Sequence, residues 1–249
     1  MMDLAVFVRS VLVVAEKNVR IYYYKGPVVV FGLLFPFIMF LTFFIGRNLD
    51  LLLFFPGFLA MMLFFTASSV GPLITPWEKR EKTYERLLSL PVTLDSVILG
   101  DIAAGSVFGV LITGLVWGVS AVFLHLALAS VGVLIAAFLL GALAFAALGT
   151  LLASTATDTP STVMMLSSLI RLPLIVVRGI FIPLGQMTGW EQALTSLSPL
   201  TYLVDLFHAG LNGDAVYPPV LDAIVLVMVV LAFIYLAKIL QKRNLVKGL

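Results

Sequence analysis

Long runs of hydrophobic residues alternate with short charged segments along the whole chain. Each run holds close to the ~20 apolar residues that a helix needs to cross the hydrocarbon core of a bilayer. The pattern therefore predicts an all-α integral membrane protein with six transmembrane helices, and we expect Pro36 to kink the first of them. The expected spans are about 27–45, 51–75, 96–124, 127–154, 162–177 and 219–240.

The first segment, residues 3–21, places Arg9, Glu16 and Arg20 on one stripe of a helix and apolar side chains around the rest. This pattern is typical of an amphipathic helix that lies in the membrane interface. A signal peptide is the alternative, but the early Asp3 and the lack of a small-x-small cleavage pattern argue against it.

Residues 77–91, between the second and third spans, are too charged to lie in lipid. As one helix ended by Pro91, the segment would carry Trp77, Tyr84 and Leu88 on an apolar stripe along an otherwise charged surface. A solvated loop is the alternative, but the patterning favours a cytoplasmic docking helix. The candidate docking residues are Trp77, Glu78, Glu81, Tyr84, Glu85, Arg86 and Leu87.

Basic residues set the orientation of the spans. Every Lys and Arg except Arg47, Arg171 and Arg178 falls in the N-terminal segment, the 77–91 segment or the C-terminal tail. In a six-span chain these three segments share one face of the membrane, and the positive-inside rule makes that face cytoplasmic. The sequence thus predicts a multi-pass protein of the cell membrane with both termini in the cytoplasm.

Small residues recur at helical spacing in the third span, as Gly105-x-x-x-Gly109 and Gly114-x-x-x-Gly118. Such pairs let two helices approach closely. Either a dimer interface or close packing within one helix bundle would explain them.

Residues 178–217 are apolar but interrupted by Gly and Pro, so they are too broken to span and too apolar for a solvated loop. We expect short re-entrant helices here, buried in protein or lining a wet cavity. Just before them, Arg171 falls near the middle of the fifth span and Arg178 follows seven residues later. An intramembrane Arg indicates function by default, so both are candidates to line a substrate path. The structural alternative for Arg171 is an ion pair with Asp101 or Asp222.

Composition supports the membrane class. The chain has 249 residues, 61% hydrophobic and 11% charged, against ~25% charged in an average soluble domain. It has no cysteine, only two histidines and a net charge of +2, so we expect no metal site, no catalytic residue and no nucleic-acid binding. The sequence also lacks the Gly-x-x-x-x-Gly-Lys-Ser/Thr pattern of a P-loop, so we expect no cofactor in this chain.

Two stretches resemble the membrane subunit of ABC type-2 exporters. The run from Glu78 to Pro91 is similar to that family's E-x-x-x-x-T-x-E-x-L-x-x-x-P segment. Gly179 to Pro183 and Ser198-Pro199-Leu200-Thr201-Tyr202 are similar to its G-x-x-x-P and N-P-L-T-Y segments. Ser198 stands where the family usually has Asn, and Arg178 stands where a small residue is common, which leaves the substrate class open.

The resemblance implies a single ABC type-2 transmembrane domain over residues 1–249, with the six spans, the interfacial helix and the re-entrant helices. It implies a homodimer that works with separate ABC ATP-binding subunits, which bind the ATP and press on the 77–91 coupling helix. The re-entrant positions that it marks are Pro183, Pro199 and Tyr202. The expected function is the permease part of an exporter for an amphipathic small molecule, a lipid or a lipid-linked glycan. A gradient-driven secondary transporter and a non-transporting membrane assembly protein are the alternatives.

Overall fold

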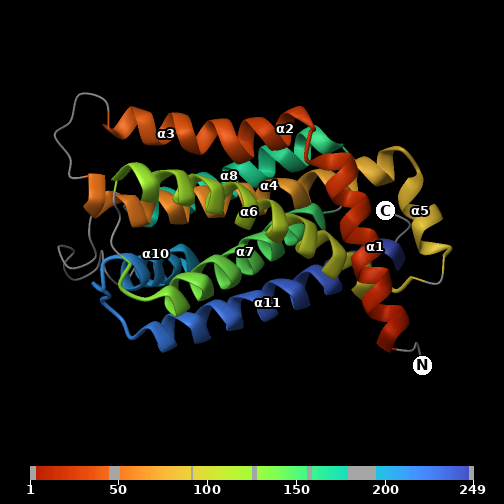
Figure 1. Cartoon of the computed structure of the whole chain (residues 1–249). Coiled ribbons are helices and arrows are strands. Elements are labelled where there is room, and N and C mark those ends of the chain that lie inside the picture. The colour runs from red at the N-terminus through yellow and green to blue at the C-terminus, as the bar shows by residue number, and fades with distance from the viewer. Residues whose placement is uncertain are drawn as a thin grey trace.

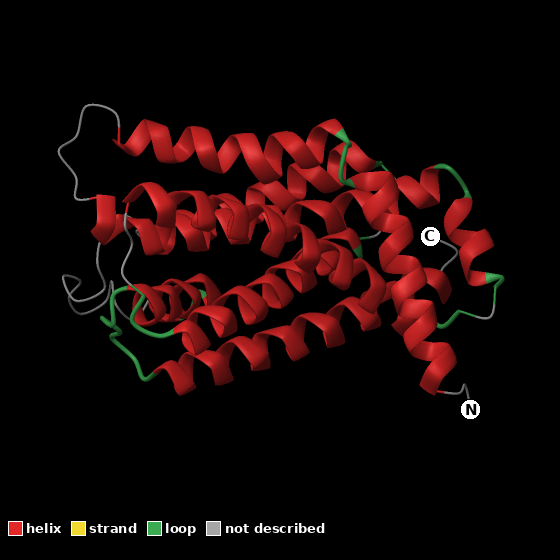
Figure 2. Cartoon of the chain, in the orientation of Figure 1, coloured by secondary structure: helices red, strands yellow, loops and turns green. Residues whose placement is uncertain are grey.

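A computed structural model describes residues 4–44, 51–90, 92–124, 128–155, 159–178 and 195–246. Within these ranges every regular element is a helix (Figure 2). The elements are α1 (Leu4–Tyr22), α2 (Gly26–Val29), the π-helix η1 (Val30–Leu34), α3 (Phe35–Phe44), α4 (Leu51–Arg80), α5 (Thr83–Leu88), α6 (Leu94–Leu124), α7 (Val131–Ala153), α8 (Pro160–Arg178), α10 (Pro199–Leu211) and α11 (Pro219–Val246). The expected all-α class is therefore confirmed.

Among the described residues, four helices are long and apolar enough to cross a membrane: α4, α6, α7 and α11. They match four of the six expected spans. The other two expected spans, 27–45 and 162–177, correspond to α2–α3 and α8. The α2–α3 segment adds a fifth span only if α1 and the helix after it count as one broken span, bent by 89°. The apolar part of α8, Pro160–Ile175, is shorter than the four long helices.

Helix α1 lies across one end of the bundle, nearly at right angles to the helices beside it (Figure 1). It buries Val14, Asn18 and Tyr22, which recur every four residues and so share one face. This face packs on α6, where a side chain at Gly100 would meet Cβ of Val14 at 2.6 Å. The segment expected to be amphipathic is thus a helix with one buried face, and its position in the membrane interface stays a prediction.

The helix from α2 to α3 widens into one π-turn just before Pro36. Proline has no N–H to donate to the carbonyl four residues earlier, so it disrupts regular α-helical bonding. The N–H of Phe35 instead reaches back to the carbonyl of Val30, one residue further than in an α-helix. The helix expected to kink at Pro36 thus carries the π-turn η1 just before this proline.

Helix α4 forms the centre of the bundle and packs on both α6 and α7 through small residues. A Cβ at Gly71 would lie 2.5 Å from the backbone of Gly149 on α7, and one at Gly105 would lie 2.8 Å from the carbonyl of Ala67. The first small-residue pair of α6 therefore packs within the bundle. At Gly114 and Gly118 an added Cβ would have nothing within 4 Å in the described chain, so that pair remains open to the dimer interpretation.

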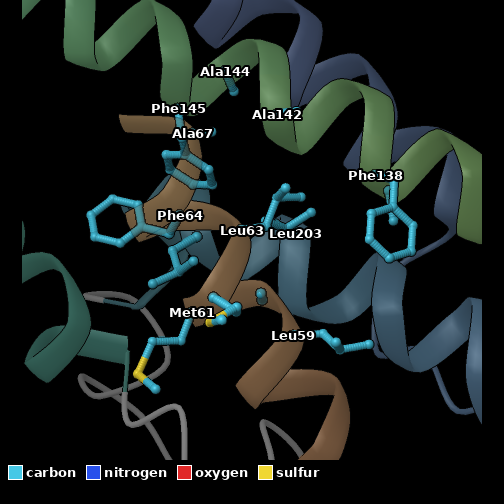
Figure 3. Packing of buried hydrophobic residues seen from close by; sticks show 14 of the residues in the cluster. Leu59, Met61, Leu63, Phe64, Ala67, Phe138, Ala142, Ala144, Phe145 and Leu203 are labelled. Carbon is cyan, nitrogen blue, oxygen red and sulfur yellow. The ribbon is translucent and has the colours of Figure 1, made fainter. Parts of the chain in front are cut away.

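Larger side chains fill the space that the close helix contacts leave (Figure 3). Phe64 of α4 meets Phe145 of α7 edge to face, with ring centroids 4.8 Å apart. Phe138 of α7 meets Phe207 of α10 in the same way at 5.1 Å. These contacts hold α10 inside the bundle, at the end opposite α5 (Figure 1).

The single helix expected over 77–91 is wrong. Helix α4 continues to Arg80, the chain turns at Glu81 and Lys82, and α5 begins at Thr83. Lys82 has φ 55° and ψ 24°, a left-handed conformation that costs a residue with a side chain ~1–2 kcal/mol. The turn redirects the chain so that Tyr84 becomes buried, and that burial offsets the cost.

Candidate functional site: the charged end of the bundle

Helix α1, helix α5 and the end of α11 all lie at one end of the bundle (Figure 1). The predicted docking residues all lie at this end, on the last turn of α4, in the turn after it (Glu81) and on α5. Their side chains divide into an inner set that contacts other helices of the same chain and an outer set that faces away from it.

Glu78 belongs to the inner set. It is only 4% exposed, and its carboxylate accepts a hydrogen bond from Nζ of Lys17 on α1. Next to this ion pair, Nδ2 of Asn18 donates to Oδ1 of Asp101 on α6 at 2.7 Å. The two bonds fasten α1 to α4 and α6, so Glu78 anchors the charged end within the chain.

Tyr84 also belongs to the inner set and is 3% exposed. Its hydroxyl donates to Oε1 of Gln241 on α11 at 3.5 Å, and Nε2 of Gln241 donates to Oγ of Ser154 at 3.1 Å. Asn244 completes the group, because its Nδ2 donates to the carbonyl of Ser154 at 2.9 Å. We call Tyr84, Ser154, Gln241 and Asn244 the α5 clasp, since they tie α5 to α7 and α11.

Burial keeps the Tyr84 hydroxyl protonated. Desolvation raises the pKa of this phenol well above its usual range, and the negative charges of Asp101 and Glu78 raise it further. Tyr84 is therefore a neutral hydrogen-bond donor at physiological pH, which suits an anchoring role.

The outer set comprises Glu81, Glu85 and Arg86, all exposed. Trp77 and Leu87 are half-buried between the two sets, and Nζ of Lys25 lies 4.6 Å from the centroid of the Trp77 ring. The sequence placed Trp77, Tyr84 and Leu88 on an apolar stripe that could pack on the chain's own helices or on a partner, with Glu81, Glu85 and Arg86 directed at the partner. Tyr84 packs within the chain, and a turn separates it from the half-buried Trp77, so the two do not share one continuous helix. Contact of Glu81, Glu85 and Arg86 with a partner stays a prediction.

Arg171 lies in α8 and is 1% exposed. Its Nη2 donates a hydrogen bond to the backbone carbonyl of Ser68 on α4. Asp101, which sequence reasoning offered as an acidic partner, accepts a bond from Asn18 instead. Arg171 thus joins α8 to the central helix, and in this conformation it does not border open space. Arg178 is the last residue of α8, and a substrate path along these two residues stays a prediction.

The helix that the structure describes within the predicted re-entrant region is α10, which is too short at 13 residues to cross a bilayer. Pro199 occupies its first turn, where the missing N–H of proline is harmless. Tyr202 donates to the carbonyl of Ser196 at 2.8 Å, and its ring centroid lies 5.9 Å from that of Tyr217. Pro183 lies outside the described residues.

Sequence reasoning missed Asp205, which is 1% exposed. Its carboxylate accepts the backbone N–H of Val216 at 3.0 Å and that of Tyr217 at 2.8 Å, so it fastens the loop before α11 to α10. The available signal was a lone acid within the apolar Leu203-Val204-Asp205-Leu206 run. Gln241 and Asn244 were missed because, by sequence, they read as part of a polar tail.

These features define an integral membrane protein in which a charged surface is built onto the end of a helix bundle. The sequence model of the ABC-2 type transporter family matches residues 9–212. The chain therefore belongs to the ABC-2 type transporter family, as the motifs had indicated, and it is a transporter permease that spans the membrane several times. No curated protein matches the chain well enough to count as a relative.

Proposed function

We propose that this chain is the permease subunit of an ATP-driven exporter and that a separate ABC ATP-binding subunit docks on the charged end. The observation that carries the proposal is that some side chains of residues 77–87 are bonded to the bundle while others are exposed. Glu78 and Tyr84 fix the segment to the bundle, while Glu81, Glu85 and Arg86 stay exposed on it. A rigidly held charged surface is suited to a partner that must rebind in every cycle.

In this proposal α2–α3 and α8 complete six spans, and both termini are cytoplasmic. The region that contains α10 is re-entrant and lies near the outer surface, where Pro199 and Tyr202 shape it. The ATP-binding subunit holds the ATP, and the chain itself supplies no catalytic residue. The cargo is an amphipathic small molecule, a lipid or a lipid-linked glycan, moved outward by a homodimer with Arg171 and Arg178 near its route.

In this arrangement, movement of α5 is transmitted to other helices of the chain. The α5 clasp connects α5 to the ends of α7 and α11, and the Lys17–Glu78 pair connects the end of α4 to α1. When ATP closes the partner subunits, the force on α5 passes into three helices of the bundle and into the interfacial helix.

The test uses the charge reversal Glu85→Arg with Asp214→Arg as its control. Asp214 is also exposed, but it lies at the opposite end, in the loop before α11. The chain is co-expressed with an ABC ATP-binding subunit, and co-purification and transport-stimulated ATP hydrolysis are measured. We expect Glu85→Arg to lose both and Asp214→Arg to keep both, because only the first adds repulsion at the docking surface.

Equal behaviour of the two variants would contradict the docking role of Glu85. Transport that persists without any ATP-binding subunit and collapses when ion gradients are dissipated would identify a secondary transporter. A chain that binds its partner but moves no cargo would favour an assembly role.

A further inference from the structure

A groove of about 490 Å³ lies between the start of the α2–α3 helix, the end of α4 and the start of α8. Its inner walls are apolar, while its end near the charged end of the bundle carries Trp77 and Arg80. The remaining lining residues are Pro27, Phe31, Leu73, Pro160, Ser161, Met164, Met165 and Ser168. The volume falls in the ~300–1,000 Å³ range of pockets that hold small organic ligands.

The groove runs along the direction of the helices that form it. Leu73 and Arg80 are seven residues apart on α4, which at ~1.5 Å per residue corresponds to ~10 Å. Pro160 and Ser168 are eight residues apart on α8, or ~12 Å. In a membrane, the Arg80 end therefore lies at the interface, and the far end lies within the hydrocarbon.

Two cations, Arg80 and Lys25, lie near the interfacial end. The side chain of Arg80 is exposed, and Lys25 lies over the Trp77 ring at 4.6 Å from its centroid. Glu78 is turned away and paired with Lys17, and the exposed Glu81, which follows Arg80 directly, does not line the groove. The groove thus combines positive charge and an interfacial tryptophan at its mouth with an apolar interior.

We propose that this groove binds one membrane phospholipid with an anionic headgroup. The phosphate contacts the guanidinium of Arg80, which matches phosphate in charge and in hydrogen-bond geometry. Lys25 adds to the positive field, and one acyl chain lies along Phe31, Leu73 and Met164. The lipid joins α2 to α8, two helices that both pack on α4. The proposal concerns the membrane chain alone and does not depend on an ATP-binding partner.

The experiment measures lipid retention and thermal stability of the purified full-length chain. The chain is prepared in detergent with vesicle lipid, either dioleoylphosphatidylglycerol or dioleoylphosphatidylcholine, and retained lipid is counted by native mass spectrometry. We expect one retained phosphatidylglycerol per chain and a melting temperature that rises with that lipid to saturation. Phosphatidylcholine, which has no net charge, should be retained less and should stabilise less.

Two variants locate the site, and one controls for charge. Arg80→Gln should weaken retention of phosphatidylglycerol about tenfold, the effect of one lost charge-assisted hydrogen bond. Ser161→Trp should block the groove sterically from an exposed position. Arg243→Gln removes an exposed cation at the same end of the molecule but outside the groove, so it should retain the lipid as the parent does.

Four results would overturn the proposal. Equal retention of both lipids would show that charge plays no part. Equal losses in Arg80→Gln and Arg243→Gln would reveal diffuse surface attraction. Full stabilisation by glycerol phosphate would identify a site for the free anion. A Ser161→Trp chain with altered self-association and unchanged lipid retention would show that a second copy of the chain covers the groove.

Discussion

Tyr84 is the residue on which the shape of the charged end depends most. Its ring is enclosed and its hydroxyl is bonded to Gln241, so a side chain from a charged segment becomes part of the bundle interior. Tyrosine suits this position because it buries a large apolar surface and still satisfies its polar atom. Neighbouring Glu85 and Arg86 remain exposed on the same short helix.

Replacing Tyr84 should separate the contribution of its buried ring from that of its hydroxyl hydrogen bond. Tyr84→Ala removes the buried ring and should lower the free energy of unfolding by ~3–5 kcal/mol. Tyr84→Phe keeps the ring and removes one hydrogen bond, so its loss should be ~0.5–1.5 kcal/mol. Thermal unfolding in detergent checks both values. Tyr24→Ala is the control, because Tyr24 is 89% exposed, and a loss as large there would contradict the anchoring role.

The Lys17–Glu78 pair offers a second test at this scale. The Glu78 side chain is 5% exposed, whereas both members of the Glu16–Arg20 pair on α1 are more than half exposed. Breaking a buried pair leaves a charge without its partner and costs ~3–5 kcal/mol, while a surface pair contributes ~0–1 kcal/mol. Lys17 is 28% exposed, so water screens it and Glu78→Gln should fall at or below the lower end of that range. Glu16→Gln should be nearly neutral, and equal unfolding temperatures for the two variants would argue against an anchoring pair.

At the scale of the element, the apolar runs located the helices to within a few residues. The span expected at 127–154 is α7, Val131–Ala153, and the span expected at 96–124 is α6, which begins at Leu94. Hydrophobic length is a local property, so the sequence states it directly. The turn at Lys82 was missed because its cause, the contact between Tyr84 and Gln241, joins residues 157 positions apart.

Close packing of α4 on α7 gives a prediction for a single glycine. At Gly71 an alanine Cβ would lie 2.5 Å from a backbone carbon of Gly149 and 2.6 Å from the backbone nitrogen of Thr150. Backbone cannot move aside as a flexible side chain does, so Gly71→Ala should push the helices apart and reduce both folded yield and melting temperature. Overpacking typically costs ~1–3 kcal/mol.

Gly114→Ala is the matched control for Gly71→Ala, since nothing in the described chain lies within 4 Å of the added atom. It should be neutral or slightly stabilising, because alanine favours the helix by up to ~1 kcal/mol over glycine. A selective loss of dimer in this variant would instead place Gly114 in an interface between two copies.

At the scale of the whole molecule, the candidate site could be located from the sequence but not built from it. The charged residues of 77–87 indicated a water-exposed surface, but the sequence left open whether Trp77 and Tyr84 pack on the chain itself or on a partner. The bonds that hold this surface come from α1, α7 and α11, and the sequence gives no measure of which distant residues meet. Arg171 illustrates the same limit, because its partner is a backbone carbonyl that no residue pattern marks.

The last prediction concerns which end of the bundle faces the cytoplasm. Single cysteines can test it, because the parent chain contains none. Lys82 and Asp214 are both exposed, and they lie at opposite ends of the bundle (Figure 1). The basic residues cluster at the Lys82 end, so the positive-inside rule places that end in the cytoplasm. In intact cells, a membrane-impermeant maleimide should label Asp214→Cys and leave Lys82→Cys unlabelled. After the cells are opened, Lys82→Cys should react as well, which shows that its thiol is accessible. Labelling of Lys82→Cys from outside intact cells would invert the chain and remove the docking surface from the side where ATP-binding subunits reside.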